Sequence, residues 1–180
     1  MLCHDPKAWG PTMDAAPRMT AGRRFYRTML NRIKAILEEN FLCVLATCSE
    51  NRPHCSLMAY IYDAKENILY MMTLRTTQKY HNIRHNPRVS VLVDTRHLLS
   101  GSENNQALTI SATCSLSAAA KIRSDILRRM VERHPNLQDL AGIPDIEVLT
   151  LRPTSFLLMD GALKSHYYPL EGSEALSVNI

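Results

Sequence analysis

Apolar residues recur every three or four positions over residues 20–40, which is the spacing of an amphipathic helix. Thr20 can cap the start of this helix. A second amphipathic helix is predicted after Ser117, with Ile122, Ile126 and Met130 inward, and Pro135 closes it. Residues 1–19 show no periodicity and predict an extended N-terminal arm.

Between and after these helices the pattern is that of short strands. The predicted strands cover residues 41–47, 54–62, 67–74, 88–94, 106–117 and 145–160, with a short polar helix at 76–85. Polar turns at 49–53 and 63–66 join the first three strands at hairpin spacing, and Pro153 predicts a bulge or a sheet edge. Because no regular helical crossovers separate the strands, the pattern predicts an α+β barrel instead of a parallel sheet.

The composition is that of a globular protein. Hydrophobic residues make up 46% of the 180 residues and charged residues 21%, and the net charge is +4. No basic run resembles a nucleic-acid-binding tail, and no window approaches the length of an apolar membrane span. Five cysteines without a C-x-x-C pair suggest neither a zinc site nor a disulfide framework. We therefore expect a cytoplasmic protein with no nucleic-acid partner, no membrane segment and no metal site.

The segment 73–82 has the composition of an anion site. It leaves a predicted strand and opens a short helix, whose first N–H groups and positive dipole end attract a phosphate. Thr73, Thr76 and Thr77 add hydroxyl groups, and Lys79 adds a full charge. The segment matches neither the phosphate loop of nucleoside triphosphatases nor the dinucleotide fingerprint. Capping threonines and a surface lysine would explain the same residues without a ligand.

Other chemistry receives less support from the sequence. His81 and His85 form a pair at helical spacing, but no metalloprotease motif accompanies them, so we interpret them as surface histidines. His54 and His166 stay open as ligands or acid–base groups. No ordered set of residues indicates hydrolytic catalysis.

The order of the elements and the pattern T-x-x-x-T-x-K-x-x-N-I-x-x-N-P-x-V-S sharpen the interpretation. On these features the chain resembles the flavin-binding split-barrel family related to pyridoxamine 5'-phosphate oxidase. The matching positions are Thr73, Thr77, Gln78, Lys79, Asn82, Ile83, Asn86, Pro87, Val89 and Ser90. The resemblance implies an α+β fold with a six-stranded antiparallel split β-barrel and flanking helices. It places this domain at residues 20–165, between the arm at 1–19 and a C-terminal tail at 166–180.

The resemblance also implies a cofactor and an assembly. The family binds FMN between two protomers, so the chain is expected to form a homodimer with the flavin at the subunit interface. Carried over by position, the phosphate region falls to Thr73, Gln78 and Lys79, and Gln106 contacts the flavin from the neighbouring subunit. The full set of implied cofactor-binding residues is His54, Cys55, Ser56, Leu57, Met58, Met72, Thr73, Thr77, Gln78, Lys79, Asn82 and Gln106.

Two departures narrow the implied activity. The second strand of the family's oxidases supplies an arginine and a lysine to the phosphate, whereas residues 55–60 of this chain hold no cation. The C-terminal arginine and histidine motif that holds pyridoxal is missing after Arg152. We therefore expect an FMN-dependent oxidoreductase acting on an unidentified small molecule, with NADH or NADPH as reductant, and not a pyridoxamine 5'-phosphate oxidase proper. The alternatives are a non-catalytic flavin-binding or sensor protein, or a haem- or deazaflavin-binding relative of the same fold.

Overall fold

The computed structural model describes residues 21–95, 106–116, 120–161 and 164–170. The predicted N-terminal arm and the end of the predicted C-terminal tail lie outside these residues. The strands are β1 (Leu42–Ser49), β2 (Arg52–Ala59), β3 (Ile61–Asp63), β4 (Ile68–Leu74), β5 (Arg88–Asp94), β6 (Gln106–Ser115), β7 (Ile146–Asp160) and β8 (Lys164–Pro169). The helices are α1 (Ala21–Glu39), α2 (Gln78–His85), α3 (Ala120–Arg133), α4 (Gln138–Ala141) and the 3₁₀ turn η2 (Pro135–Leu137).

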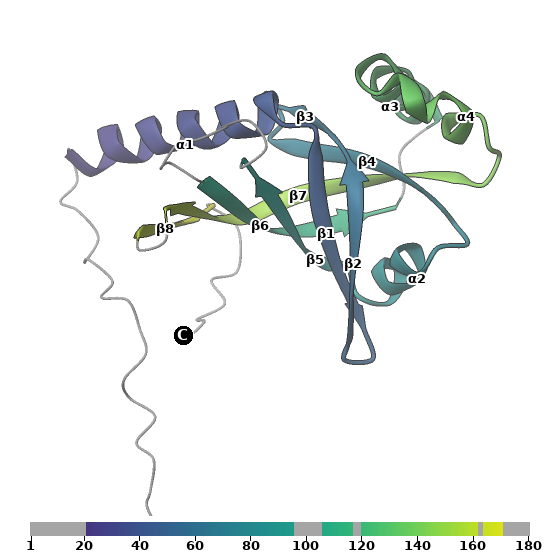
Figure 1. Cartoon of the computed structure of the whole chain (residues 1–180), viewed down its shortest axis with the longest axis horizontal. Coiled ribbons are helices and arrows are strands. Elements are labelled where there is room, and N and C mark those ends of the chain that lie inside the picture. The colour runs from purple at the N-terminus through teal and green to yellow at the C-terminus, as the bar shows by residue number, and fades with distance from the viewer. Residues whose placement is uncertain (1–20, 96–105, 117–119, 162–163, 171–180) are drawn as a thin grey trace, which may run out of the picture.

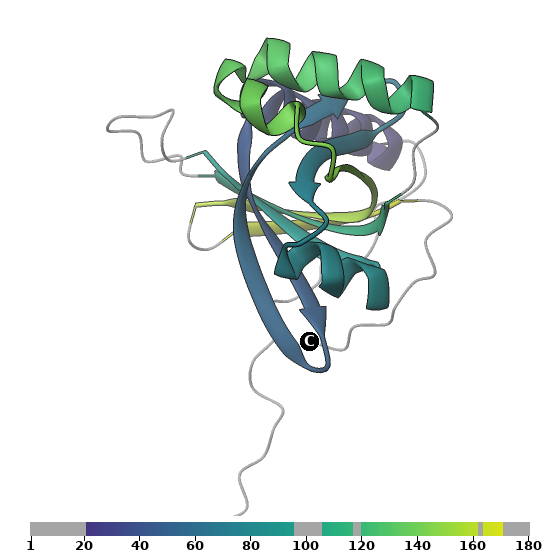
Figure 2. The same ribbon diagram turned by 90° about the vertical axis from the view of Figure 1, so that its right-hand side faces the viewer.

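The eight strands of the described residues belong to one curled antiparallel sheet, in the order β2-β1-β5-β6-β7-β4-β3, with β8 paired to β7. Figure 1 shows α1 along the upper side of this sheet, α3 and α4 together at the upper right, and α2 at the lower right beside β2. Figure 2 shows the sheet curling around a common interior, with β1 and β2 on one wall. The predicted α+β split-barrel fold is confirmed.

The number of strands differs from the six that we predicted. The predicted strand at 54–62 breaks at Tyr60, whose N–H donates to the carbonyl of Phe41 at 3.1 Å, and the chain continues as β2 and β3. β8 adds an eighth strand at residues 164–169, across the domain boundary that we expected at residue 165. Its sequence, KSHYYP, carries no alternation that would mark it as a strand.

Two local features follow the sequence closely. The β1–β2 hairpin closes through Glu50 and Asn51, with φ of 51° and 57°, as a two-residue turn of the primed type requires. The predicted irregularity at Pro153 is a bulge in β7, because Ala112 pairs with Pro153 and Ser111 with Ser155, so that Thr154 is the extra residue.

The core is divided between the two faces of the sheet. The larger cluster fills the barrel, where it includes Val89, Val91 and Val93 of β5 and the inward face of α1. A smaller cluster lies between α3 and the β4–β7 pair. In α3 the predicted inward residue Ile122 is 53% exposed, because the helix turns Arg123 to the sheet instead, where its guanidinium donates to the carbonyl of Ile146. None of the helices in the described ranges is both long and apolar enough to cross a membrane.

Candidate functional site

The junction of β4 and α2 brings two of the predicted threonines together. Thr73 ends the buried part of β4 and is 3% exposed, and its hydroxyl lies 2.9 Å from the Thr77 hydroxyl. The Thr77 hydroxyl donates to the carbonyl of Leu74 at 2.9 Å, so it accepts the hydrogen of Thr73. Thr77 is the N-cap residue of α2, yet its side chain makes no capping hydrogen bond. The first N–H groups of α2 are therefore left without a side-chain acceptor from their own cap residue.

Lys79 lies in the first turn of α2 and is half-buried. Burial lowers the pKa of its ammonium group from the ordinary value. In the part of the chain that the structure describes, no carboxylate forms an ion pair with Lys79. A cation that has lost part of its hydration without gaining an anion is poised to bind one.

A chain of polar contacts fixes α2 against the β1–β2 hairpin. Gln78 Nε2 donates to Asn82 Oδ1 at 2.8 Å, and Asn82 Nδ2 donates to the Thr47 hydroxyl at 3.1 Å. Asn82 is 2% exposed, so its side chain is a bridge inside the protein and not a surface group. Of the two predicted binding residues, Gln78 is exposed and accessible, whereas Asn82 holds the helix in place.

An ion pair that the sequence analysis missed lies beside these groups. The Arg75 Nε donates to Glu147 Oε2 at 2.9 Å, and the Nη2 of the same guanidinium lies 2.9 Å from that oxygen. Glu147 is 7% exposed and stands directly opposite Thr73 in the β4–β7 ladder. The one signal in the sequence was a single carboxylate inside the apolar stretch IEVLTL, which indicates a buried partner but does not say which one.

The predicted ring-binding residues of β2 alternate between the two faces of the strand. The set consists of His54, Cys55, Ser56, Leu57 and Met58. His54, Ser56 and Met58 pair with Thr47, Leu45 and Cys43 of β1 and face the inside of the barrel. Met58 is buried there in the core. Cys55 and Leu57 lie on the outer face, where Leu57 is 72% exposed. One ligand can therefore meet side chains of only one face, or the backbone of β2, which is an edge strand with β1 as its neighbour.

Two other predicted residues lie apart from this junction. Met72 points to the opposite face of β4 from Thr73 and packs in the cluster beneath α3. Gln106 stands opposite Asp160, and its Nε2 donates to that carboxylate at 3.2 Å. Thr73 and Gln106 thus face opposite ends of β7, thirteen residues apart (147 to 160), which at ~3.3 Å per residue is on the order of 40 Å along the strand. One chain does not bring them together.

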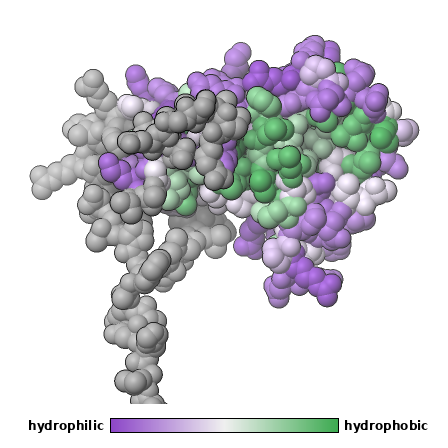
Figure 3. Space-filling view, viewed as in Figure 1, coloured by the Kyte–Doolittle hydropathy of each residue, from purple (hydrophilic) through white to green (hydrophobic). Residues whose placement is uncertain are grey.

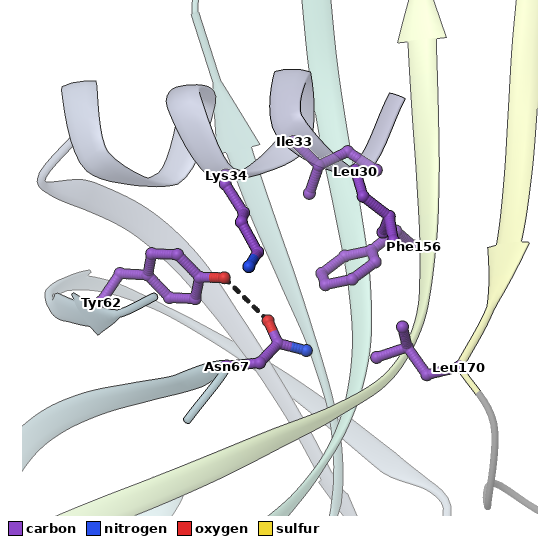
Figure 4. Close-up of a pocket in the computed structure, with 7 residues that line it drawn as sticks. All are labelled: Leu30, Ile33, Lys34, Tyr62, Asn67, Phe156 and Leu170. Atoms are coloured by element: carbon purple, nitrogen blue, oxygen red, sulfur yellow. Dashed lines mark hydrogen bonds between the residues drawn. The ribbon is translucent and has the colours of Figure 1, made fainter. Parts of the chain in front are cut away.

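A separate cavity of about 170 Å³ lies between α1 and the sheet. Figure 4 shows its mainly apolar lining and the hydrogen bond in which the Tyr62 hydroxyl donates to Asn67 Oδ1 at 2.8 Å. The residues that line it are Leu30, Ile33, Lys34, Tyr62, Asn67, Phe156 and Leu170. The Lys34 ammonium donates to the carbonyl of Ala64 at 3.3 Å. This cavity includes none of the residues predicted to bind a cofactor.

Comparison with known proteins agrees with the sequence pattern. The family model described as pyridoxamine 5'-phosphate oxidase matches residues 29–160. A pyridoxamine 5'-phosphate oxidase homolog of Schizosaccharomyces pombe is 37% identical over 71 residues, which are 35% of this chain and 37% of that protein. The chain thus spans a little over a third of the length of this curated relative.

Solved structures share the fold at low sequence identity. An FAD-binding protein of Mesorhizobium loti has a TM-score of 0.58 at 16% identity, over 72% of this chain and 90% of that one. A haem-binding protein of Mycobacterium smegmatis has a TM-score of 0.63 at 15% identity, over 74% of this chain and 57% of that one. At these identities the structural similarity is evidence for the fold alone.

Proposed function

The chain belongs to the pyridoxamine 5'-phosphate oxidase family, as its sequence pattern predicted, and on that premise we propose that it binds FMN and uses it to oxidise or reduce a small molecule. The proposed phosphate site is the N-terminus of α2 with Thr73, Thr77, Gln78 and Lys79. The proposed ring site is the edge of β2.

The observation that carries this proposal is the state of Lys79 and the helix end beside it. The ammonium is half-buried without a carboxylate in the described residues, and the N-cap hydroxyl is turned to Leu74 instead of to the helix. A phosphate group at this point would accept hydrogen bonds from the first-turn N–H groups and from Lys79. It would also restore to the ammonium the stabilisation that burial removes.

The residues of this chain would bind and orient the cofactor, and a bound flavin would itself supply the hydride or electron transfer. Lys79 and the helix end would hold the phosphate. The unpaired edge of β2 offers backbone N–H and C=O groups to the polar edge of a flat ring. Of the β2 side chains, His54 and Ser56 lie on the same side of the sheet as the Thr47–Asn82 contact, and in this proposal they would contact the ligand. This arrangement asks for no acid or base from the protein.

We further propose that two copies of the chain form the complete site. Gln106 lies at the far end of β7 from Thr73, so a flavin contact from Gln106 requires a second protomer. The outer face of the sheet suits such a contact, because the register aligns Leu57, Val44, Leu92, Thr109, Leu157 and Tyr167 in one row across six strands. Leu57 is 72% exposed and Tyr167 54%. Figure 3 shows a hydrophobic patch at the middle of the molecule, over β1 and β2.

The test of the binding proposal is the absorbance spectrum of the protein after incubation with excess FMN and removal of free ligand. We expect flavin bands near one FMN per chain. A colourless protein would refute the proposal. Haem is the second candidate, favoured by the shared fold with the Mycobacterium smegmatis haem-binding protein, and it would give a Soret band instead. A deazaflavin coenzyme would give a third, distinct spectrum.

Turnover separates an enzyme from a binding protein. The FMN-loaded protein is mixed with NADH or NADPH and a panel of small electron acceptors, and nicotinamide oxidation is followed by absorbance. An oxidoreductase gives a steady rate proportional to protein concentration. Tight binding of FMN with no rate above that of free FMN would support the storage or sensor alternative.

A further inference from the structure

The ion pair of Arg75 and Glu147 lies beside Thr73 of the proposed phosphate site. Arg75 follows β4 directly, in the turn that leads to α2, and its N–H donates to the carbonyl of Asp145 at 3.1 Å. Thr73 lies two positions earlier, within β4, and faces Glu147 across the ladder. Glu147 thus links the two residues: the Arg75 guanidinium binds its carboxylate, and Thr73 is its partner across the ladder.

The exposure of the two partners is unequal. The Glu147 side chain is 9% exposed, whereas that of Arg75 is 51% exposed. Only one oxygen of Glu147 receives the guanidinium, through Nε and Nη2. A guanidinium carries five N–H donors in a planar fork, so donors remain on the exposed side of Arg75 after this contact. Glu147 therefore fixes the side chain without using all of its donors.

The charges around the end of α2 depend on this pair. Glu147 alone would place a buried negative charge beside Thr73 and would repel a phosphate. With Arg75 paired to it, the local sum of Lys79, Arg75 and Glu147 is one positive charge. The hydrogen bond to Glu147 also raises the pKa of Arg75, so this guanidinium stays charged.

We propose that Arg75, positioned by Glu147, is a second cation of the anion site at α2 and makes the site prefer phosphorylated over unphosphorylated ligands. This inference rests on the function proposed above. It answers the absence of cations at residues 55–60: a residue of the β4–α2 turn takes over the task that the family's oxidases give to their second strand. Glu147 acts through Arg75 as a positioning residue and has no contact with the ligand of its own.

The experiment compares FMN with riboflavin, which has the same ring and no phosphate. Dissociation constants for both are measured by flavin fluorescence for the wild-type chain and for Arg75→Ala, Glu147→Gln, the Arg75→Ala/Glu147→Gln double variant and Arg84→Ala. Arg84→Ala is the matched control, because Arg84 is an exposed cation in the last turn of the same helix. The ratio of the two constants is the readout that a purely structural role would not move.

We expect Arg75→Ala to raise the dissociation constant for FMN about tenfold, because one charge-assisted hydrogen bond to the phosphate is lost. The dissociation constant for riboflavin should stay unchanged. Glu147→Gln should also lower the preference for FMN, although it removes a negative charge, because Arg75 is no longer held. The double variant has no buried unpaired carboxylate, so it tests the role of Arg75 even if Arg75→Ala folds poorly. It should still bind FMN several-fold more weakly than the wild type, and Arg84→Ala should match the wild type.

Several outcomes would overturn the inference. Full recovery of FMN affinity in the double variant would mean that Arg75 only masks Glu147. Tighter FMN binding by Glu147→Gln would remove the positioning role. An unchanged ratio in Arg75→Ala, with a wild type that binds FMN well, would refute this inference and leave the proposed function standing. A wild type that binds neither flavin would refute both.

Discussion

Replacing Lys79 by methionine tests the proposed phosphate site by removing one charged group. The substitution should lower FMN affinity and raise the stability of the ligand-free protein. Methionine keeps the length and much of the volume of the side chain and removes its charge. The ammonium is half-buried and lacks a carboxylate partner in the described residues. Loss of the ammonium group should therefore weaken the binding of an anion. In the ligand-free protein it should remove an unfavourable, partly desolvated charge.

The magnitude follows from the position of the charge. Two unit charges about 4 Å apart interact by about 4 kcal/mol at an effective dielectric constant of about 20. Because Lys79 is only half-buried, solvent screening reduces this to about 2 kcal/mol. That corresponds to an FMN dissociation constant about thirtyfold higher in Lys79→Met. Fluorescence titration with FMN measures it, with riboflavin as the control ligand whose affinity should not change.

The pH dependence of FMN affinity should also depend on the charge of Lys79. Burial places the pKa of Lys79 below its ordinary value, whereas a bound phosphate favours the charged form. FMN affinity should therefore fall as the pH rises through the lowered pKa of the ligand-free protein, and this fall should be missing in Lys79→Met. For folding the sign is reversed: because the pKa is lower in the folded than in the unfolded chain, the stability of the ligand-free protein rises with pH over that range.

At neutral pH, Lys79→Met should accordingly raise the free energy of unfolding of the ligand-free protein while it lowers FMN affinity. Urea denaturation measures the first effect. An FMN affinity that changes by less than about threefold would show that the phosphate lies elsewhere, and a large loss of riboflavin binding would show that the variant disturbs the ring site instead.

Three further predictions concern the interface, the helix support and the core. Leu57→Glu should convert the proposed dimer to a monomer with little loss of chain stability, because Leu57 is 72% exposed in one chain. Light scattering measures the mass in solution, and a variant that stays dimeric would refute the interface. Asn82→Ala should lower the free energy of unfolding by about 1–3 kcal/mol in urea, since it removes the hydrogen bonds of a buried amide to Thr47 and Gln78, and an unchanged midpoint would contradict the bridging role. Burial raises the pKa of Cys43 and Cys114 to about 12, so at pH 8 iodoacetamide should modify both only after unfolding, as peptide mass spectrometry would detect.

The sequence by itself predicted the features that depend on local patterns. The sequence predicted a strand at residues 88–94, and the structure places Val89, Val91 and Val93 of this strand in the barrel core. The spacing of apolar residues in the first helix identified its inward face, including Ile33 and Leu37. The family pattern between Thr73 and Ser90 predicted the fold class, because a turn between a strand and a short helix is encoded by residues that are adjacent in the sequence.

Only the tertiary structure decided which distant residues meet. Arg75 and Glu147 are 72 positions apart, and nothing near either residue names its partner. The family resemblance assigned Gln106 to the flavin of the neighbouring subunit, and only the sheet shows that it lies at the opposite end of β7 from Thr73. Periodicity reports how a side chain faces its own helix or strand, whereas strand order and register depend on the packing of the whole sheet. The sequence therefore predicted an anion site at the start of α2, and the curled sheet decided which charged residues lie near that helix end.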